Sequence, residues 1–408
     1  MAPPSPSRER HALAFVLITM LVDTIGLGIV IPVMPQLIAT LGHGGIGDAA
    51  RWGGGLMFVY ASMQFLCAPL MGNLGDRYGR RPVLILALLA LGIDYLVSAL
   101  APTLGWLFVA RLLSGAAGAT YPTVNAYIAD ITPPERRSVN FGLTGAAFGV
   151  GFIVGPAIGG IVGQHFGPRA PFLVAAAIAG LNALYGTFVL AESLPPERRR
   201  RFEWWRANPL GTLMALKRFP TLAPLLIVLV LMRFAHDANP SVWSYYVMLR
   251  FHWTAADVGN SLALVGVALA LVMGLLTRIL IPRIGEPRAV MLGLASAAAA
   301  CAGYAFAPSS LVLCLWIPAF ALFGLASPAL NGLMSRTVPD TEQGELQGAV
   351  ASLGGLTSIF APPALTQVFG YYTGPHAPHY FPGAAYLLAA GCLAAALATF
   401  IATRPRRA

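Results

Sequence analysis

The chain has 408 residues, of which 57% are hydrophobic and only 10% are charged, with a mean hydropathy of +0.70. Soluble domains carry about 25% charged residues, so this composition excludes a soluble protein and indicates an integral membrane protein. The net charge of +10 is typical of nucleic-acid binding too, but 21 of the 26 Lys and Arg residues fall in the termini and in alternate loops. That asymmetry is the bias that keeps basic loops in the cytoplasm, and nucleic acid is therefore excluded as a partner.

Twelve apolar runs approach or exceed the roughly 20 residues that span the hydrocarbon layer. They cover approximately residues 12–40, 52–73, 82–101, 104–129, 139–163, 170–191, 221–248, 257–281, 288–307, 310–335, 345–370 and 382–402. The basic loops alternate correctly only with twelve spans, so both termini are expected in the cytoplasm. The predicted fold is an all-α membrane protein with twelve transmembrane helices in two pseudo-symmetric six-helix bundles.

The first run contains an acid, Asp23, about eleven residues from its start. At 1.5 Å per residue this is roughly 16 Å deep, near the midplane. An acid there costs a few kcal/mol and usually faces the interior of the bundle, and burial favours its protonated form. We therefore predict that Asp23 carries a proton between the two sides. A neutral acid bonded to a backbone carbonyl near Gly26 and Gly28 remains the structural alternative.

The loop after the second run reads Gly72-Asn73-Leu74-Gly75-Asp76-Arg77-Tyr78-Gly79-Arg80-Arg81. Glycines permit the close approach and special backbone angles of so short a turn. One acid among three arginines can form a charge network that breaks and re-forms between states. Gly72, Asp76, Arg77, Gly79 and Arg80 are accordingly predicted to control the conformational change.

Two charges in the third and fourth runs, Asp94 and Arg111, lie equally far from the turn near residues 102–103. Adjacent antiparallel helices bring them to the same depth, so they are predicted to form a salt bridge. A static brace and a switch opened by substrate or proton are both compatible with this pair. Asn125 follows Arg111 at heptad spacing, on a face that we expect to line the cavity.

The fifth run carries glycines on one face at Gly145, Gly149, Gly151, Gly155 and Gly159, with Gly155 directly before Pro156. Glycines four residues apart make a flat face for tight packing against another helix. We assign Gly151, Gly155 and Pro156 to the conformational machinery. No predicted strand precedes these glycines, which excludes a dinucleotide loop.

The longest polar break, residues 192–220, divides the chain into bundles at 1–191 and 221–408, joined by a cytoplasmic linker. Paired halves of this kind are typical of secondary transporters with a midplane site. The seventh run then concentrates Arg233, His236, Asp237 and Asn239 before a proline. These four residues are predicted to line the cavity. His236 and Asp237 are candidates for a proton step, since histidine titrates near neutrality, although Asp237 is also placed to pair with Arg233.

Three weaker candidates for substrate contact occur in the second half. The ring of Trp243 is suited to stack on a planar ligand, or equally to anchor the protein at the membrane interface. Asn331 and Gln347 lie at positions expected to face each other on neighbouring helices.

The loop after the second run resembles the signature loop of the major facilitator superfamily, and the glycine-proline pattern of the fifth run is similar to that of its drug/proton antiporters. The resemblance narrows to the tetracycline/proton antiporter family. It is carried by Asp23 to Gly28 with Pro32 and Pro35, Gln64 with Pro69, Asp94-Tyr95, Arg111 to Gly115, Ile128 to Asp130, Pro240 to Trp243, and Gln343 to Gly348. It implies that Asp76, Arg80 and Asp130 form a cytoplasmic network, and that Gln64, Asp94 and Arg111 lie near the substrate path.

The same resemblance implies proton-coupled efflux of a tetracycline-like drug or of several drugs by alternating access. It implies a monomer in the bacterial inner membrane, driven by the proton-motive force without cofactor or metal. The chain departs from the family at Ala297, where the tetracycline pumps have an acid, and at Leu269, where they have a histidine. A symporter or metabolite exporter of the same superfamily is therefore the alternative. A receptor or channel is disfavoured by the paired halves, and an enzyme by the lack of a phosphate loop, metal cluster or nucleophile elbow.

Overall fold

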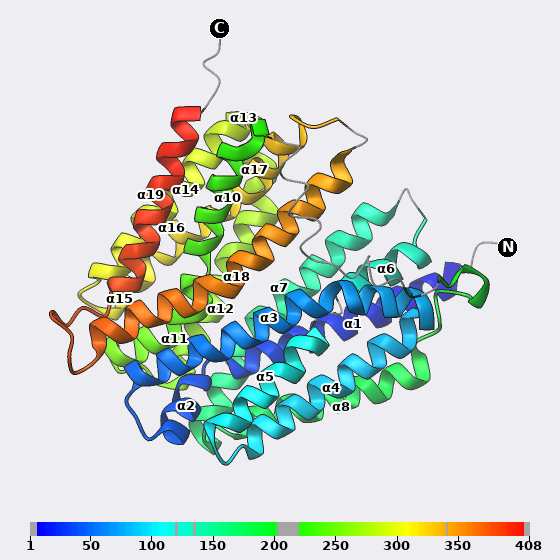
Figure 1. The fold of residues 1–408 in the computed structure, drawn as a ribbon, viewed down its shortest axis with the longest axis horizontal. Coiled ribbons are helices and arrows are strands. Elements are labelled where there is room, and N and C mark those ends of the chain that lie inside the picture. The colour runs from blue at the N-terminus through cyan, green and yellow to red at the C-terminus, as the bar shows by residue number, and fades with distance from the viewer. Residues whose placement is uncertain are drawn as a thin grey trace, which may run out of the picture. The chain divides into compact units, whose positions relative to one another are not determined.

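A computed structural model describes residues 6–118, 121–133, 136–200, 202, 220–339 and 342–403 of the chain. Within these residues every regular element is a helix (Figure 1). The α-helices are α1 (Pro6–Val30), α2 (Met34–Gly42), α3 (Ile46–Tyr78), α4 (Arg80–Leu100), α5 (Leu104–Gly118), α6 (Tyr121–Ile131), α7 (Arg137–Phe166), α8 (Ala170–Val189), α10 (Ala223–His236), α11 (Ala238–Phe251), α12 (Ala255–Leu271), α13 (Thr277–Ile284), α14 (Glu286–Phe306), α15 (Ser310–Leu315), α16 (Ile317–Ala321), α17 (Ala326–Ser335), α18 (Gln343–Thr373) and α19 (Ala384–Thr403).

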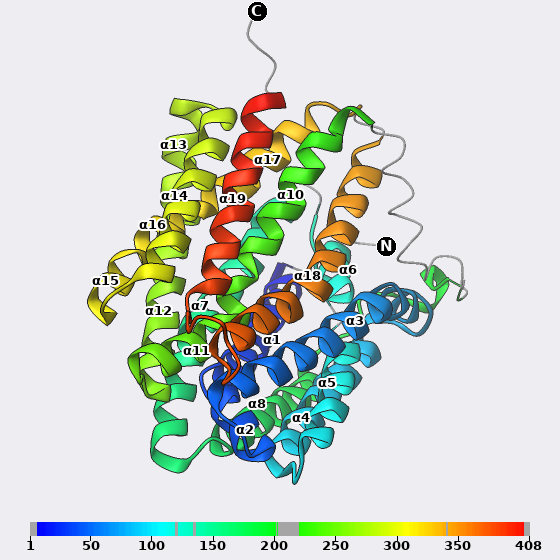
Figure 2. The ribbon, with the colours of Figure 1, turned by 60° about the vertical axis from the view of Figure 1, so that its left-hand side comes forward.

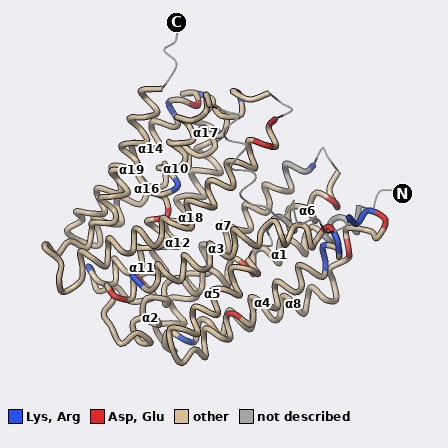
Figure 3. The backbone as a smooth tube through the Cα atoms, in the orientation of Figure 1, with Lys and Arg blue, Asp and Glu red and all other residues tan. Residues whose placement is uncertain are grey.

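Eleven of the twelve predicted spans appear among the described residues as helical stretches long and apolar enough to cross a membrane. The remaining run, 104–129, corresponds to α5 and α6, which lie on either side of residues 119–120, outside the described part of the chain. Figure 3 shows how rarely charged residues occur along these helices. A twelve-helix, all-α membrane fold is the result.

Some predicted runs are interrupted, and proline accounts for part of this. The run at 12–40 divides into α1 and α2 at a turn over residues 31–33, where Pro32 lacks the N–H that a continuous helix needs. The run at 221–248 divides at Asp237, three residues before Pro240. Between α12 and α13 the helix widens into one π-helical turn, η6 (Val272–Leu276), which the sequence pattern did not predict.

The helices form two compact units, and each takes a short segment from the opposite half of the sequence. Unit 1 contains the described residues of Met1–Gly42, Val59–Pro209 and Thr254–Ala263, and unit 2 those of His43–Phe58, Leu210–Trp253 and Leu264–Ala408. In unit 1 the start of α12 packs against α7, where Thr254 donates a 3.4 Å hydrogen bond to Gln164. In unit 2 Arg51, near the start of α3, donates a 2.9 Å bond to the Gly370 carbonyl of α18.

The predicted bundles at 1–191 and 221–408 therefore differ from these units at the two exchanged segments, His43–Phe58 and Thr254–Ala263. The division into two sequential bundles stays a prediction. The linker prediction falls largely on residues 203–219, outside the described residues.

Helix α7 packs closely on α1 in unit 1 through part of its glycine face. A Cβ added at Gly155 would lie 2.7 Å from the Ile25 carbonyl oxygen, and one at Gly151 would lie 2.7 Å from the Thr24 Cβ. Gly145 and Gly149, by contrast, face space that holds no atom within 4 Å. The tight surface therefore covers only the second part of the predicted face.

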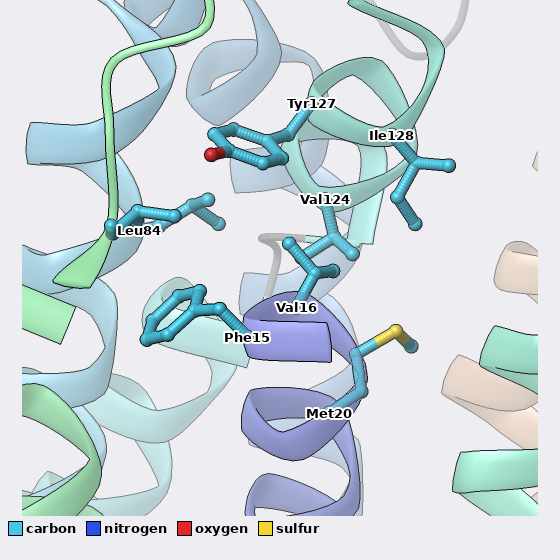
Figure 4. Packing of buried hydrophobic residues seen from close by; sticks show 8 residues of the cluster. Phe15, Val16, Met20, Leu84, Val124, Tyr127 and Ile128 are labelled. Atoms are coloured by element: carbon cyan, nitrogen blue, oxygen red, sulfur yellow. The ribbon is translucent and has the colours of Figure 1, made fainter. Parts of the chain in front are cut away.

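One end of unit 1 is filled by an apolar core, shown in Figure 4. Phe15 and Val16 of α1 meet Tyr127 of α6, each at most 2% exposed, and Leu190 packs beside them just after α8. The Tyr127 hydroxyl donates a 3.0 Å hydrogen bond to the Ala191 carbonyl. The chain after α8 is thereby held against the end of the bundle.

In unit 2 the helices α10, α14 and α19 run together (Figures 1 and 2). An aromatic cluster joins α11 to α14 and α19: Trp243 lies edge-on to Tyr304 at 5.2 Å between ring centroids, and Tyr246 lies edge-on to Tyr386 at 5.1 Å. Such arrangements contribute about 0.5–1.5 kcal/mol per pair beyond the burial of area.

The two halves repeat with a constant spacing over much of their length. Helices α14, α15 and α18 each begin 206 residues after α4, α5 and α7, respectively. The residue before α4 is Gly79, with φ +102° and ψ 159°, and the residue before α14 is Gly285, with φ +82° and ψ 156°. Both conformations require glycine, so the repeat extends to the detail of the turn.

Candidate functional site

The predicted salt bridge between Asp94 of α4 and Arg111 of α5 is confirmed. The Arg111 Nη2 atom lies 3.0 Å from Asp94 Oδ2 and 3.2 Å from Oδ1. The Asp94 side chain is 0% exposed and that of Arg111 is 13% exposed. Removing one partner from such a pair is more costly than replacing both.

A tyrosine links this pair to the acid of α1. The hydroxyl of Tyr95 lies against Gly26, because a Cβ added there would be 3.2 Å from it. Asp23 is one helical turn before Gly26 and so shares its face, and Asp23, Asp94 and Arg111 all act electrostatically on Tyr95. The Tyr95 hydroxyl is buried and has no hydrogen-bond partner among the described residues.

Helix α3 contributes two polar side chains to the same region. The Gln64 Nε2 atom is 3.4 Å from the Tyr60 hydroxyl and 3.3 Å from the Gly118 carbonyl oxygen of α5. Tyr60 lies in the field of Asp23, Asp94 and Arg111. We call Asp23, Tyr60, Gln64, Asp94, Tyr95 and Arg111 the central cluster. Sequence reasoning missed its two tyrosines, although Tyr95 directly follows Asp94. Asn125 of α6 is half-buried, and its role in lining the cavity stays a prediction.

The charged loop of unit 1 forms the network that the resemblance implied. The Arg80 Nη1 atom is 2.7 Å from Asp76 Oδ1, and its Nε atom is 3.4 Å from Asp130 Oδ2. A cavity of about 510 Å³ lies beside this network, and Leu194, Arg198 and Arg200 also line it. Of the other loop residues, Arg77 has its guanidinium carbon 5.0 Å from the centroid of the Tyr78 ring, and Gly72 faces open space. Their conformational role stays a prediction.

Glu192 belongs to this network and was missed. Its Oε1 atom accepts hydrogen bonds from the backbone N–H groups of Arg80, at 2.9 Å, and of Leu194, at 3.1 Å. The first N–H groups of a helix have no acceptor within the helix, so Glu192 supplies the acceptor for the first backbone N–H of α4. It was assigned to the linker, yet its position as the first charge after the sixth run was an available signal.

In unit 2 the polar residues of α10 and α11 divide into separate environments. The His236 Nδ1 atom lies 3.6 Å from Asp237 Oδ1, and its ring stacks on Phe323 at 5.6 Å. The partner that the structure gives Asp237 is thus His236, where spacing had favoured Arg233. Arg233 itself is exposed.

Several buried oxygens of unit 2 remain available to a ligand. Asp237 Oδ2, Asn239 Oδ1 and Asn331 Oδ1 have no hydrogen-bond partner among the described residues. Trp243 is only 1% exposed within the aromatic cluster, and Gln347 is exposed on α18. The substrate-contact role of these residues stays a prediction.

The two departures from the tetracycline pumps fall in apolar surroundings. Leu269 packs against a cluster that includes Val272, Ala321 and Leu325, and Ala297 is 0% exposed.

Repeated helical halves, with ionisable groups buried at membrane depth, define a membrane transporter. The chain belongs to the Major Facilitator Superfamily, whose family model matches residues 16–362 and again residues 246–408. It is 38% identical over 366 residues to the tetracycline resistance protein, class C, of Escherichia coli, an alignment covering 89% of this chain and 90% of that protein. It is 29% identical to multidrug resistance protein 2 of Bacillus subtilis, over 95% of both chains.

Solved structures share the fold. The nucleoside transporter NupG superposes with a TM-score of 0.78 at 14% identity, covering 97% of this chain and 100% of that one. The human organic anion transporter MFSD10 superposes with a TM-score of 0.67 at 23% identity, covering 98% and 100%. The sequence-based assignment to the superfamily, and the resemblance to tetracycline resistance proteins, are both confirmed.

Proposed function

We propose that this protein exports small, largely planar drug molecules from the bacterial cytoplasm in exchange for protons. The observation that carries the proposal is the central cluster. It places an acid of α1 and a buried Asp94–Arg111 pair around the same tyrosine, Tyr95. Buried ionisable groups in transmembrane helices mark ion and substrate pathways.

The direction and cargo are inferred from the relatives, which are named for resistance to tetracycline and to several drugs. Export removes the drug from the compartment where it acts, and this explains resistance. Because Leu269 and Ala297 replace the histidine and the acid of the tetracycline pumps, tetracycline itself is less favoured than a broader class of planar compounds. Each pH unit of the proton gradient supplies about 1.4 kcal/mol for this work.

In this proposal Asp23 binds a proton while the central cluster is open to the outside. Asp23 then releases that proton to the cytoplasm once the transporter has changed conformation. The Asp94–Arg111 pair responds to the charge on Asp23, because both lie in the same electrostatic surroundings of Tyr95. The network of Asp76, Arg80 and Asp130 opens and closes at the cytoplasmic end. The basic loops set the termini on the cytoplasmic side of the inner membrane, and the monomer is the functional form.

Everted vesicles that contain the protein test this mechanism. Adding planar and cationic drugs to energised vesicles is expected to release protons, detected as recovery of a quenched pH-sensitive dye. Asp23→Asn should abolish the response while drug binding remains measurable. Asp48→Asn, at an acid whose side chain is 52% exposed, is the matched control and should leave the response intact.

Three results would count against the proposal. Normal exchange by Asp23→Asn would remove Asp23 from the mechanism. Drug-driven proton movement in the opposite direction would indicate a symporter. No response to any compound of the panel would refute drug antiport.

A further inference from the structure

A cavity of about 620 Å³ lies at one end of unit 2, and none of its lining residues belongs to the central cluster. It is lined by the start of α10, the turn between α13 and α14, and the ends of α17 and α19. In Figure 1 the ends of α13, α17 and α19 lie together near the point where the chain leaves α19. Its volume is within the range of ligand pockets, about 300–1,000 Å³.

Two residues that line the cavity are smaller than those found 206 positions earlier in unit 1. Thr221 and Leu333 line it, and the residues 206 positions earlier are Phe15 and Tyr127. In unit 1 both of those rings are at most 2% exposed and fill the apolar core of Figure 4. The cavity is open to its surroundings, because Thr221, Arg288 and Thr337 of its lining are exposed, so a ligand can enter it.

The lining combines apolar side chains with one positive charge. Leu225, Leu333 and Phe400 provide the apolar surface, and Arg288 is the exposed cation. The neighbouring acid, Glu286, pairs with Arg336 at 2.9 Å. No carboxylate of a described residue lies within ion-pair distance of Arg288, which therefore remains available to an anion.

The repeat indicates what kind of group belongs beside Gly285. In unit 1 the corresponding turn, at Gly79, presents the first N–H of α4 to the carboxylate of Glu192. In unit 2 Gly285 lines the cavity, and Arg288 lines it one turn further along α14. The same turn geometry thus receives an anion in one half of the protein and opens into a cavity with an arginine in the other.

We propose that this cavity binds one anionic phospholipid of the cytoplasmic leaflet. The headgroup phosphate lies between Arg288 and the start of α14, and one acyl chain lies along Leu225, Leu333 and Phe400. The occupant is amphipathic because the lining is, and it is a leaflet lipid because this end of unit 2 carries the basic loops. Basic pockets between helices on that side of a membrane bind anionic headgroups. The leaflet assignment rests on the orientation proposed above.

Native mass spectrometry of the full chain provides the test. Protein is stripped of lipid in detergent and titrated with phosphatidylglycerol or with phosphatidylcholine of the same chain length. The wild type is expected to retain one phosphatidylglycerol in preference to phosphatidylcholine. Arg288→Ala should weaken phosphatidylglycerol binding about fivefold and leave phosphatidylcholine unchanged. Arg283→Ala, at an exposed arginine outside the lining, is the matched control and should bind as the wild type does.

A second variant tests the space rather than the charge. The double substitution Thr221→Phe with Leu333→Tyr copies the residues of unit 1 into unit 2, and it should abolish the retained lipid while preserving the elution volume of the folded monomer. Equal effects of Arg288→Ala and Arg283→Ala, or a retained lipid in the filled variant, would overturn the proposal. So would displacement by millimolar inorganic phosphate, which would assign the site to a free anion, or equal retention of both lipids.

Discussion

Removal of one partner of the buried Asp94–Arg111 pair should be far more damaging than removal of both. In Asp94→Leu the guanidinium of Arg111, only 13% exposed, would lose both of its short contacts to carboxylate oxygens. An unpaired buried charge of this kind costs about 3–5 kcal/mol. In Asp94→Leu with Arg111→Met, two apolar side chains would fill similar space, and such replacements are neutral or stabilising. Arg111→Met should carry a similar cost, because it leaves the carboxylate of Asp94 unpaired. With two single losses of about 3–5 kcal/mol each and almost none in the double, the two changes should couple by about 6–10 kcal/mol.

Unfolding in mixed detergent micelles measures this coupling. Each variant is titrated with a denaturing detergent, and the free energies of unfolding of wild type, both singles and the double form a thermodynamic cycle. A loss of less than about 1 kcal/mol in Asp94→Leu, or a double variant whose loss equals the two single losses added together, would show that the pair is not a buried ion pair of the kind described. Both singles and the double should also fail to transport, because the charges belong to the central cluster.

Two further predictions concern helix packing and capping. Gly155→Ala should destabilise the protein by about 1–3 kcal/mol, because the new methyl meets the Ile25 carbonyl; Gly145→Ala, which faces open space, should be neutral or slightly stabilising. The melting temperatures of the two variants test this, and equal values would be contrary to the packing described. Glu192→Ala should cost about 1 kcal/mol through the lost acceptor at the start of α4. Exposed Glu197→Ala should cost nothing measurable, and hydrogen exchange at the first turn of α4 would distinguish them.

The lengths of the apolar runs and the distribution of basic residues between the loops predicted much of this architecture, because a bilayer leaves few alternatives to the helix. The Asp94–Arg111 pair was predictable for a related reason, since adjacent antiparallel helices place residues equidistant from their turn at one depth. The glycine face was predicted too widely. Spacing gives the face of a helix but not the length over which a neighbour contacts it, and α1 does not reach Gly145 or Gly149.

Contacts between residues distant in sequence were the least predictable. Glu192 reads as part of a polar linker, and only the fold brings it to Arg80, 112 residues away. Asp237 lies beside His236 rather than pairing with Arg233, although the i, i+4 backbone bond between Asp237 and Arg233 is still made, so helical spacing alone did not identify the side-chain partner. The cavity of unit 2 could not be predicted from the sequence. Its relation to unit 1 is seen only when residues 206 positions apart are compared, and that spacing comes from the positions at which the helices begin.

The exchanged segments have a consequence for biogenesis. Unit 1 includes Thr254–Ala263, and this segment begins 65 residues after α8 ends at Val189. At a synthesis rate of 5–20 residues per second, the first six helices wait roughly 3–13 s in the membrane before their last packing partner is made. During that interval α7 presents Gly160 and Pro156 without the residues of α12 that later cover them. Newly made chains should therefore be most vulnerable to membrane proteases and to chaperone capture within this window.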